Sequence, residues 1–214
     1  NVWAYNASNF ELLWRYNHNN TGHFPYIYDF DQDGKDEMFV GYDYVDHDGQ
    51  IKWSLPINSD HTDEIIYAST KEGEPKRLYL ASGNEGFNIV NMDGTIYKSQ
   101  EVGHAQRISI SSYDKSRNDL QVAVTSFWGA DMILYLFDGE GNLLAEREMM
   151  GNGNLVSPVA YDGKNELILA NKIEFFIPTF CISIMYLISS GVSIHHLVIV
   201  QPSLYQLFFG HYWW

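Results

Sequence analysis

The chain has 214 residues, of which 45% are hydrophobic and 19% are charged. This is the composition of a globular domain, and it excludes a disordered, collagen-like or coiled-coil protein. Because 13 Lys and Arg face 27 Asp and Glu, the formal net charge is −14, which argues against a surface for nucleic acid or anionic membrane. Cys181 is the single cysteine, so no intrachain disulfide or thiolate-rich metal site can form.

The chain opens in a strand-like pattern without an initiator Met, and we interpret it as a piece of a longer protein. From there, a unit of two short apolar runs recurs with a period of roughly 40–47 residues. The first run of each unit is predicted at residues 25–28, 64–67, 107–110 and 158–161. The second run is predicted at residues 38–41, 78–81, 120–124 and 167–170. No helical periodicity persists before residue 173, so the units are read as antiparallel strands.

A hairpin follows the second run in the first three units, at residues 45–51, 90–96 and 137–143. Each hairpin contains Asp-Gly or Glu-Gly, which supplies the positive φ that a tight turn requires. Residues 5–12 resemble a degenerate further copy. A repeat of this length is typical of a β-propeller blade, and we predict an all-β fold for residues 1–172, a β-propeller fragment of three to four blades. A β-sandwich with regular strand spacing is the alternative.

Residues 173–214 form an anomalous apolar tail, with Glu174 as the only acidic residue and no Lys or Arg. Residues 175–194 carry no charge and are long enough to cross a bilayer, although Pro178 and Gly191 interrupt them. Three interpretations remain open: a non-native or out-of-frame segment, a membrane anchor, or strands of the core. Membrane contact is expected only if this tail is native.

An acidic loop between the first two predicted strands has the spacing of a Ca²⁺ site. Its carboxylates stand at loop positions one, three, five and nine, a glycine permits the turn at position six, and position seven offers a main-chain carbonyl. The carboxylates are those of Asp29, Asp31, Asp33 and Glu37, the glycine is Gly34, and the main-chain carbonyl is that of Lys35. Ca²⁺ prefers such hard oxygen ligands, and later repeats have lost the pattern. We predict a calcium ion that rigidifies the blade; an acidic turn without metal is the alternative.

Three histidines each directly precede the first strand of a repeat: His23, His61 and His104. Because repeat-equivalent residues of a propeller meet around its axis, we expect these side chains to converge. Converging imidazoles could bind a transition metal, or one could act as a general base. The alternative is that each histidine only hydrogen-bonds its own turn. Arg107 follows His104 by three residues and is expected on the same face.

The motifs of residues 23–53 carry a family resemblance. They read Gly-His, Tyr-Ile-Tyr-Asp, Asp-x-Asp-x-Asp-Gly-Lys-Asp-Glu and Asp-His-Asp-Gly-x-Ile-x-Trp, and Asp-His-Thr-Asp-Glu follows. This combination resembles the calcium-binding β-propellers of rhamnogalacturonan lyases and of FG-GAP-type repeat proteins.

The resemblance implies β-elimination at a uronate of a pectic or related polysaccharide, outside the cell or at its surface. A cation would neutralise the substrate carboxylate, His61 or His104 would remove the α-proton, and Arg107 would pair with the carboxylate. His23 would join the same site. This fragment alone is expected to be inactive. The alternative is a non-catalytic, extracellular calcium-binding module that binds a glycan or a protein.

Overall fold

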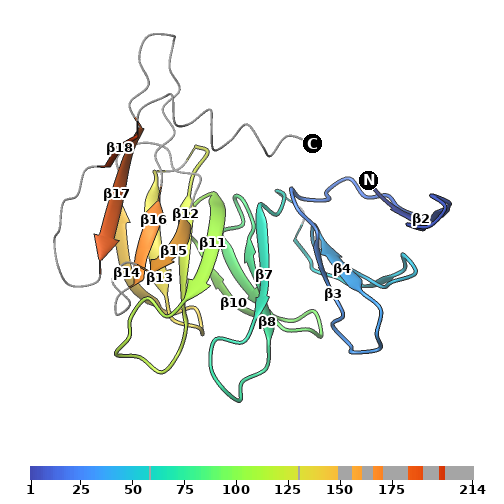
Figure 1. The fold of residues 1–214 in the computed structure, drawn as a ribbon, viewed down its shortest axis with the longest axis horizontal. Coiled ribbons are helices and arrows are strands. Elements are labelled where there is room, and N and C mark those ends of the chain that lie inside the picture. The colour runs from blue at the N-terminus through green and yellow to red at the C-terminus, as the bar shows by residue number, and fades with distance from the viewer. Residues whose placement is uncertain are drawn as a thin grey trace, which may run out of the picture.

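The computed structural model describes residues 1–57, 59–129 and 131–148, together with four later strands at 156–160, 166–170, 183–189 and 198–200. Within these residues all regular elements are β-strands, as Figure 1 shows. Sixteen of them form four sheets of four antiparallel strands, each a meander in chain order. We call these sheets blades 1 to 4.

Blade 1 contains β3 (Tyr26–Tyr28), β4 (Glu37–Val40), β5 (Asp43–Val45) and β6 (Ile51–Ser54). Blade 2 contains β7 (Glu64–Ala68), β8 (Arg77–Ala81), β9 (Phe87–Val90) and β10 (Ile96–Gln100). Blade 3 contains β11 (Ala105–Ser111), β12 (Gln121–Ser126), β13 (Ile133–Phe137) and β14 (Leu143–Glu148). Blade 4 contains β15 (Val156–Ala160), β16 (Glu166–Ala170), β17 (Ser183–Ser189) and β18 (Val198–Val200). Ahead of them, β1 (Val2–Tyr5) and β2 (Leu12–Tyr16) form a separate hairpin.

The predicted repeat is confirmed at the level of individual strands. The first apolar run of each unit is β3, β7, β11 or β15, and the second is β4, β8, β12 or β16. The three predicted hairpins connect the last two strands of blades 1 to 3. Gly49, Gly94 and Gly141 stand in these turns with φ values of 86°, 84° and 80°. The Asp-Gly and Glu-Gly pairs therefore set the turn because glycine adopts this backbone without a steric cost.

Tryptophans on the outer strands connect consecutive sheets. Trp14 on β2 donates its indole N–H to the carbonyl of His47 in the blade 1 turn, at 2.8 Å. Trp53 on β6 makes the equivalent bond to Met92 in the blade 2 turn, at 3.1 Å. A Cβ on Gly49 would lie 2.9 Å from the Trp14 ring, so the turn glycine also makes room for the indole. The hairpin β1–β2 thus packs on blade 1 as the outer strands of blade 1 pack on blade 2.

The cores lie between neighbouring blades. Phe39, Leu78 and Leu80 are fully buried in the cluster that joins blades 1 and 2. Phe87 and Phe137 are buried in the cluster that joins blades 2 and 3. Burying a side chain of this size stabilises the fold by roughly 1.5–3 kcal/mol, so the blades hold one another in place face to face. The result is a propeller-like row of blades that fans out across Figure 1.

Blade 4 extends past residue 172. Strand β17, which lies in the apolar tail, pairs with β16 from Leu167↔Ser189 to Ala170↔Tyr186, and β18 pairs with β17. The remaining tail residues lie outside the described residues, and the origin of the tail stays a prediction. Among the residues that the model describes, there is no helix with the length and apolar character needed to span a membrane.

Candidate functional site: a histidine–aspartate cluster at the blade ends

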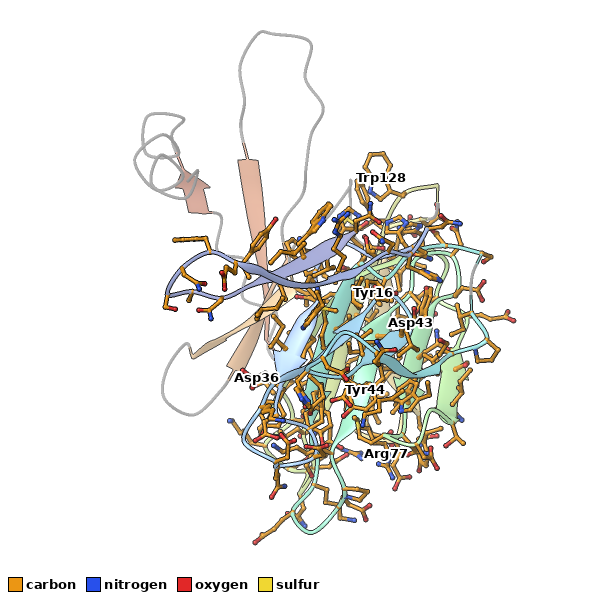
Figure 2. All side chains as sticks on the ribbon, turned by 90° about the vertical axis from the view of Figure 1, so that its right-hand side faces the viewer. Tyr16, Asp36, Asp43, Tyr44, Arg77 and Trp128 are labelled. Atoms are coloured by element: carbon orange, nitrogen blue, oxygen red, sulfur yellow. The ribbon has the colours of Figure 1, made fainter. Side chains whose placement is uncertain are left out.

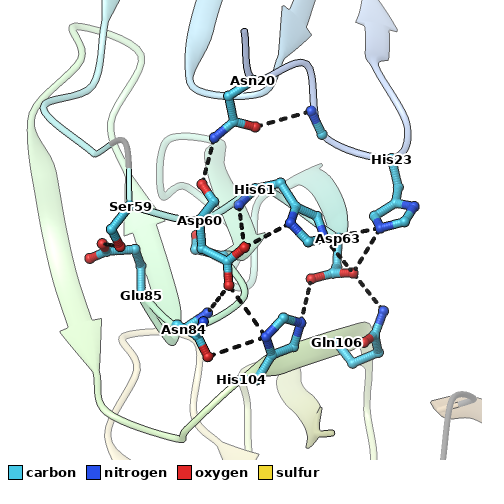
Figure 3. A network of polar contacts seen from close by, with 12 residues as sticks. Asn20, His23, Ser59, Asp60, His61, Asp63, Asn84, Glu85, His104 and Gln106 are labelled. Carbon is cyan, nitrogen blue, oxygen red and sulfur yellow. Dashed lines mark hydrogen bonds and ion pairs between the residues drawn. The ribbon is translucent and has the colours of Figure 1, made fainter. Parts of the chain in front are cut away.

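His23, His61 and His104 converge on the carboxylate of Asp63, as Figure 3 shows. The Nε2 atoms of His23 and His61 lie 3.5 and 3.6 Å from Asp63 Oδ1. The Nε2 of His104 lies 3.2 Å from Asp63 Oδ2. His23 Nε2 and His61 Nε2 are themselves only 3.0 Å apart. The structure therefore brings together the three histidines that the repeat predicted, around an aspartate from β7's N-terminal side. We call these four residues the His–Asp cluster.

Backbone hydrogen bonds fix the chain just before the first strands of blades 1 and 2. The amide of His23 donates to the carbonyl of Thr62 at 2.9 Å, which ties blade 1 to blade 2. The amide of Asp63 donates to the carbonyl of Ala81 at 2.8 Å. These bonds hold the His–Asp cluster on rigid strand ends, the arrangement that functional sites in repeat folds favour.

Asp60 contacts the Nδ1 atoms of two of the imidazoles, on the side away from Asp63. Its Oδ1 lies 2.7 Å from Nδ1 of His61, and its Oδ2 lies 3.3 Å from Nδ1 of His104. Burial raises the pKa of Asp60, but amide donors from Asn84 and His61 and the two nearby imidazoles outweigh it, so the net pKa is lowered. An ionised Asp60 favours the tautomer with a proton on Nδ1, which leaves the Nε2 lone pairs facing Asp63. This carboxylate–imidazole arrangement is typical of metal-ligating histidines.

Asp63 is 2% exposed, and its burial raises its pKa against the opposing effect of the three imidazoles. Gln106 donates to Asp63 Oδ1 at 2.5 Å. Asp63 Oδ2 and His104 Nε2 are both buried and have no hydrogen-bond partner. Unpartnered buried polar atoms are costly, and a cation placed between them would satisfy both.

The donor set fits a divalent cation. One ligand atom each from His23, His61 and Asp63 lie within 4.8 Å of one another, and His104 Nε2 stands next to Asp63. Imidazole nitrogens with a carboxylate oxygen suit first-row metals such as Zn²⁺ or Mn²⁺. A cation here could polarise a substrate carboxylate, and without one an imidazole could accept a proton.

Arg107 lies next to the cluster on β11. Gln106 reaches Asp63 at a point where the β11–β12 register is irregular, between Ala105 and Arg107, whereas Arg107 contacts Glu64 and Phe24. The Arg107 guanidinium lies 3.8 Å from Glu64 and 5.7 Å from the centre of the Phe24 ring. The Phe24 ring is in turn 6.3 Å from that of His23, so Arg107 borders the site through Phe24.

The predicted calcium loop gathers Asp29, Asp31 and Asp33, with one carboxylate oxygen of each within 4.8 Å of the others. Amide groups inside the loop orient them: Gly34 donates to Asp29 at 3.0 Å, and Lys35 donates to Asp33 at 2.9 Å. Gly34 has a φ of 88°, as the sharp turn requires. These three carboxylates could hold a calcium ion as predicted.

Glu37 lies deeper than the three loop aspartates. It is fully buried, accepts the Phe30 amide at 2.9 Å through Oε2, and leaves Oε1 without a hydrogen-bond partner. One of its oxygens groups with Asp46 and His47 of the next turn, within 4.8 Å. The Lys35 side chain lies 2.9 Å from His47 Nε2. The sequence pattern predicted Glu37 and the Lys35 carbonyl as metal ligands. It did not reveal that Asp46 and His47 lie close to Glu37.

No family model matches the chain, and no curated protein matches it. Among solved structures it is similar to the crystal structure of the exotype rhamnogalacturonan lyase YesX, with a TM-score of 0.58 and 17% sequence identity. The match covers 80% of this chain and 33% of that one, so the chain spans about a third of the YesX structure. At this identity the similarity shows a shared fold of β-blades and a distant structural relationship to a rhamnogalacturonan lyase.

Proposed function

We propose that this chain is part of a carbohydrate-active protein that cleaves a uronate-containing polysaccharide by metal-assisted β-elimination. The observation that carries the proposal is the convergence of three imidazoles on a buried carboxylate whose Oδ2 is unpartnered. The shared fold with a rhamnogalacturonan lyase supports a pectic substrate. An extracellular or cell-surface location is part of the same proposal.

The residues divide into three roles. His104, His23 and Asp63 would hold the cation, since Nε2 of His104 and of His23 lie 3.2 and 3.5 Å from the Asp63 carboxylate. When bound, the cation supplies positive charge that neutralises the substrate carboxylate and acidifies the adjacent C–H group. Asp60 holds His61 in the tautomer whose Nε2 accepts a proton.

In the reaction, Nε2 of the more exposed His61 takes the proton from C5 of the uronate. The C–H electron pair forms a C4=C5 double bond, the bond from C4 to the leaving oxygen breaks, and that oxygen takes a proton from water. Arg107 was predicted to pair with the substrate carboxylate, but it lies beside Glu64 and Phe24, so the proposal leaves that role to the cation. Because the net charge is −14, a local cation is needed before a polyanionic chain can bind.

The calcium loop has a separate, structural role in this proposal. Asp29, Asp31 and Asp33 would hold Ca²⁺ with the predicted Lys35 carbonyl and stiffen the connection between β3 and β4, while Glu37 groups with Asp46 and His47. The unpartnered Oε1 of Glu37 supports a cation on this side of blade 1.

A non-catalytic calcium-binding module that binds a glycan or protein is the second candidate. The strong negative charge favours it, because it disfavours a polyanionic substrate.

The experiment incubates the full-length protein that contains this chain with rhamnogalacturonan and with polygalacturonate, and follows the ultraviolet absorbance of the unsaturated product with and without a chelator. Our proposal predicts that the unmodified protein forms the unsaturated product. The chelator and the variants Asp63→Asn and His104→Ala should abolish this product, and the exposed-surface variant Glu101→Gln should still form it. Binding of polysaccharide without any product would favour the second candidate.

A further inference from the structure

Trp128 is the most unusual exposed side chain near the His–Asp cluster. It lies in the loop between β12 and β13, is 59% exposed, and has a φ of 46°. A bulky residue rarely adopts this left-handed backbone, and exposing an indole to water is unfavourable as well. Strained residues of this kind persist where the surrounding structure enforces them, and they gather at binding sites.

The loop that carries Trp128 is anchored to the cluster. The amide of Phe127 donates to the carbonyl of His104 at 2.8 Å. The Phe127 ring is buried and contacts the Trp128 ring, with the two ring centres 4.8 Å apart. The Ser126 hydroxyl donates to the carbonyl of Asp131 at 2.6 Å and so connects the two ends of the loop. Figure 2 shows Trp128 projecting from one end of the blades, opposite Arg77.

A second exposed aromatic ring lies beside His23. Phe24 directly follows His23 and is 57% exposed. Its ring centre is 6.3 Å from that of His23, and the Arg107 guanidinium packs on it. The cluster is therefore bordered by Phe24 next to His23 and by the Trp128 loop next to His104.

We propose that Trp128 is a stacking platform for a pyranose ring of the polysaccharide, one or more sugar units away from the unit held at the His–Asp cluster. The inference rests on the proposed function and deepens it. A sugar presents an apolar C–H face that packs on an indole while its hydroxyl groups stay in water, and such a ligand uses a ring that is flat, exposed and rigidly held. Phe24, beside His23, would contact the same polysaccharide chain.

The test measures the affinity of the protein for rhamnogalacturonan by retardation in gels that contain the polysaccharide. We expect Trp128→Ala to weaken binding about fivefold to tenfold and Trp128→Phe to stay within about twofold of the unmodified protein. The matched control is Phe10→Ala, because Phe10 is also exposed (79%) and also has a positive φ (56°), but lies in the turn between β1 and β2. We expect Phe10→Ala to leave binding unchanged.

The outcomes separate this inference from the lyase proposal. If Trp128→Ala binds as tightly as the unmodified protein while uronate cleavage is seen, the platform is wrong and the lyase stands. If Trp128→Ala loses binding while no unsaturated product forms, the platform stands and the lyase is wrong. An equal loss in Phe10→Ala, or no retardation of the unmodified protein, overturns the platform.

Discussion

The Oδ2 atom of Asp63 lies 3.2 Å from Nε2 of His104, and both atoms are buried without a hydrogen-bond partner. They approach each other closely without forming a hydrogen bond. Asp60 Oδ2 and Asn84 Oδ1 each lie 3.3 Å from Nδ1, the other nitrogen of the same imidazole. An imidazole lone pair facing a carboxylate is repulsive unless a proton or a cation lies between them. This relationship is the physical basis for a metal ion at the blade ends.

Gly83 should be essential to the arrangement around Asp60. A Cβ added there would come within 2.5 Å of Asp60 Oδ2, and its φ of 53° is in the left-handed region. We predict that Gly83→Ala destabilises the protein by about 3 kcal/mol and weakens metal binding at the cluster. The control is Gly73→Ala, with a φ of 82° and open space around it, which should cost only the backbone strain of about 1–2 kcal/mol. Equal losses of stability in the two variants, measured by urea unfolding, would show that the contact with Asp60 is unimportant.

The calcium loop should make the thermal stability of the protein depend on Ca²⁺. Calcium at about a hundred times its dissociation constant should stabilise the folded protein by about 2.7 kcal/mol. Asp31→Ala removes a carboxylate of the group and should abolish the rise of Tm with calcium. Asp36→Ala removes an exposed acidic residue of the same loop and should leave that rise intact. Thermal denaturation with and without calcium distinguishes the two, and a calcium response that survives Asp31→Ala would refute the loop as the site.

Asp119 should make stability depend on pH. Arg117 forms two hydrogen bonds to its carboxylate, at 2.8 and 3.0 Å, and these lower the Asp119 pKa against the opposing effect of burial. Because the folded pKa lies below the unfolded one, this stabilisation is complete above the unfolded pKa and is lost as the pH falls through the folded pKa.

We therefore predict that Asp119→Asn lowers the Tm at pH 7, and that the difference from the unmodified protein shrinks as the pH falls below about 4. Melting curves from pH 7 to pH 3 provide the measurement, with exposed Glu72→Gln as the control. A difference in Tm that stays constant over this range would contradict the assignment.

The blades could be predicted from the sequence because their signals are local. Turn glycines such as Gly94 and the alternation within each strand depend on neighbouring residues only. The convergence of the three histidines was also predictable, since equivalent positions of a repeat meet at the same end of a propeller.

The contacts across blades were harder to predict. Asp63 and Gln106 meet although 43 positions separate them, and no local pattern indicates which residue of β11 faces the cluster. The β11–β12 register is irregular at this point, and the structure places Gln106 against Asp63 and Arg107 beside Glu64. Asp46 was missed for a similar reason, because its proximity to Glu37 depends on how the β5–β6 turn folds over the loop.

The most direct test of the metal centre is titration calorimetry with Mn²⁺, with calcium present to fill the acidic loop. We predict one Mn²⁺ site in the unmodified protein, its loss in Asp63→Asn and in His104→Ala, and its retention in Asp31→Ala. Full Mn²⁺ binding by folded Asp63→Asn would contradict the His–Asp cluster as a metal centre.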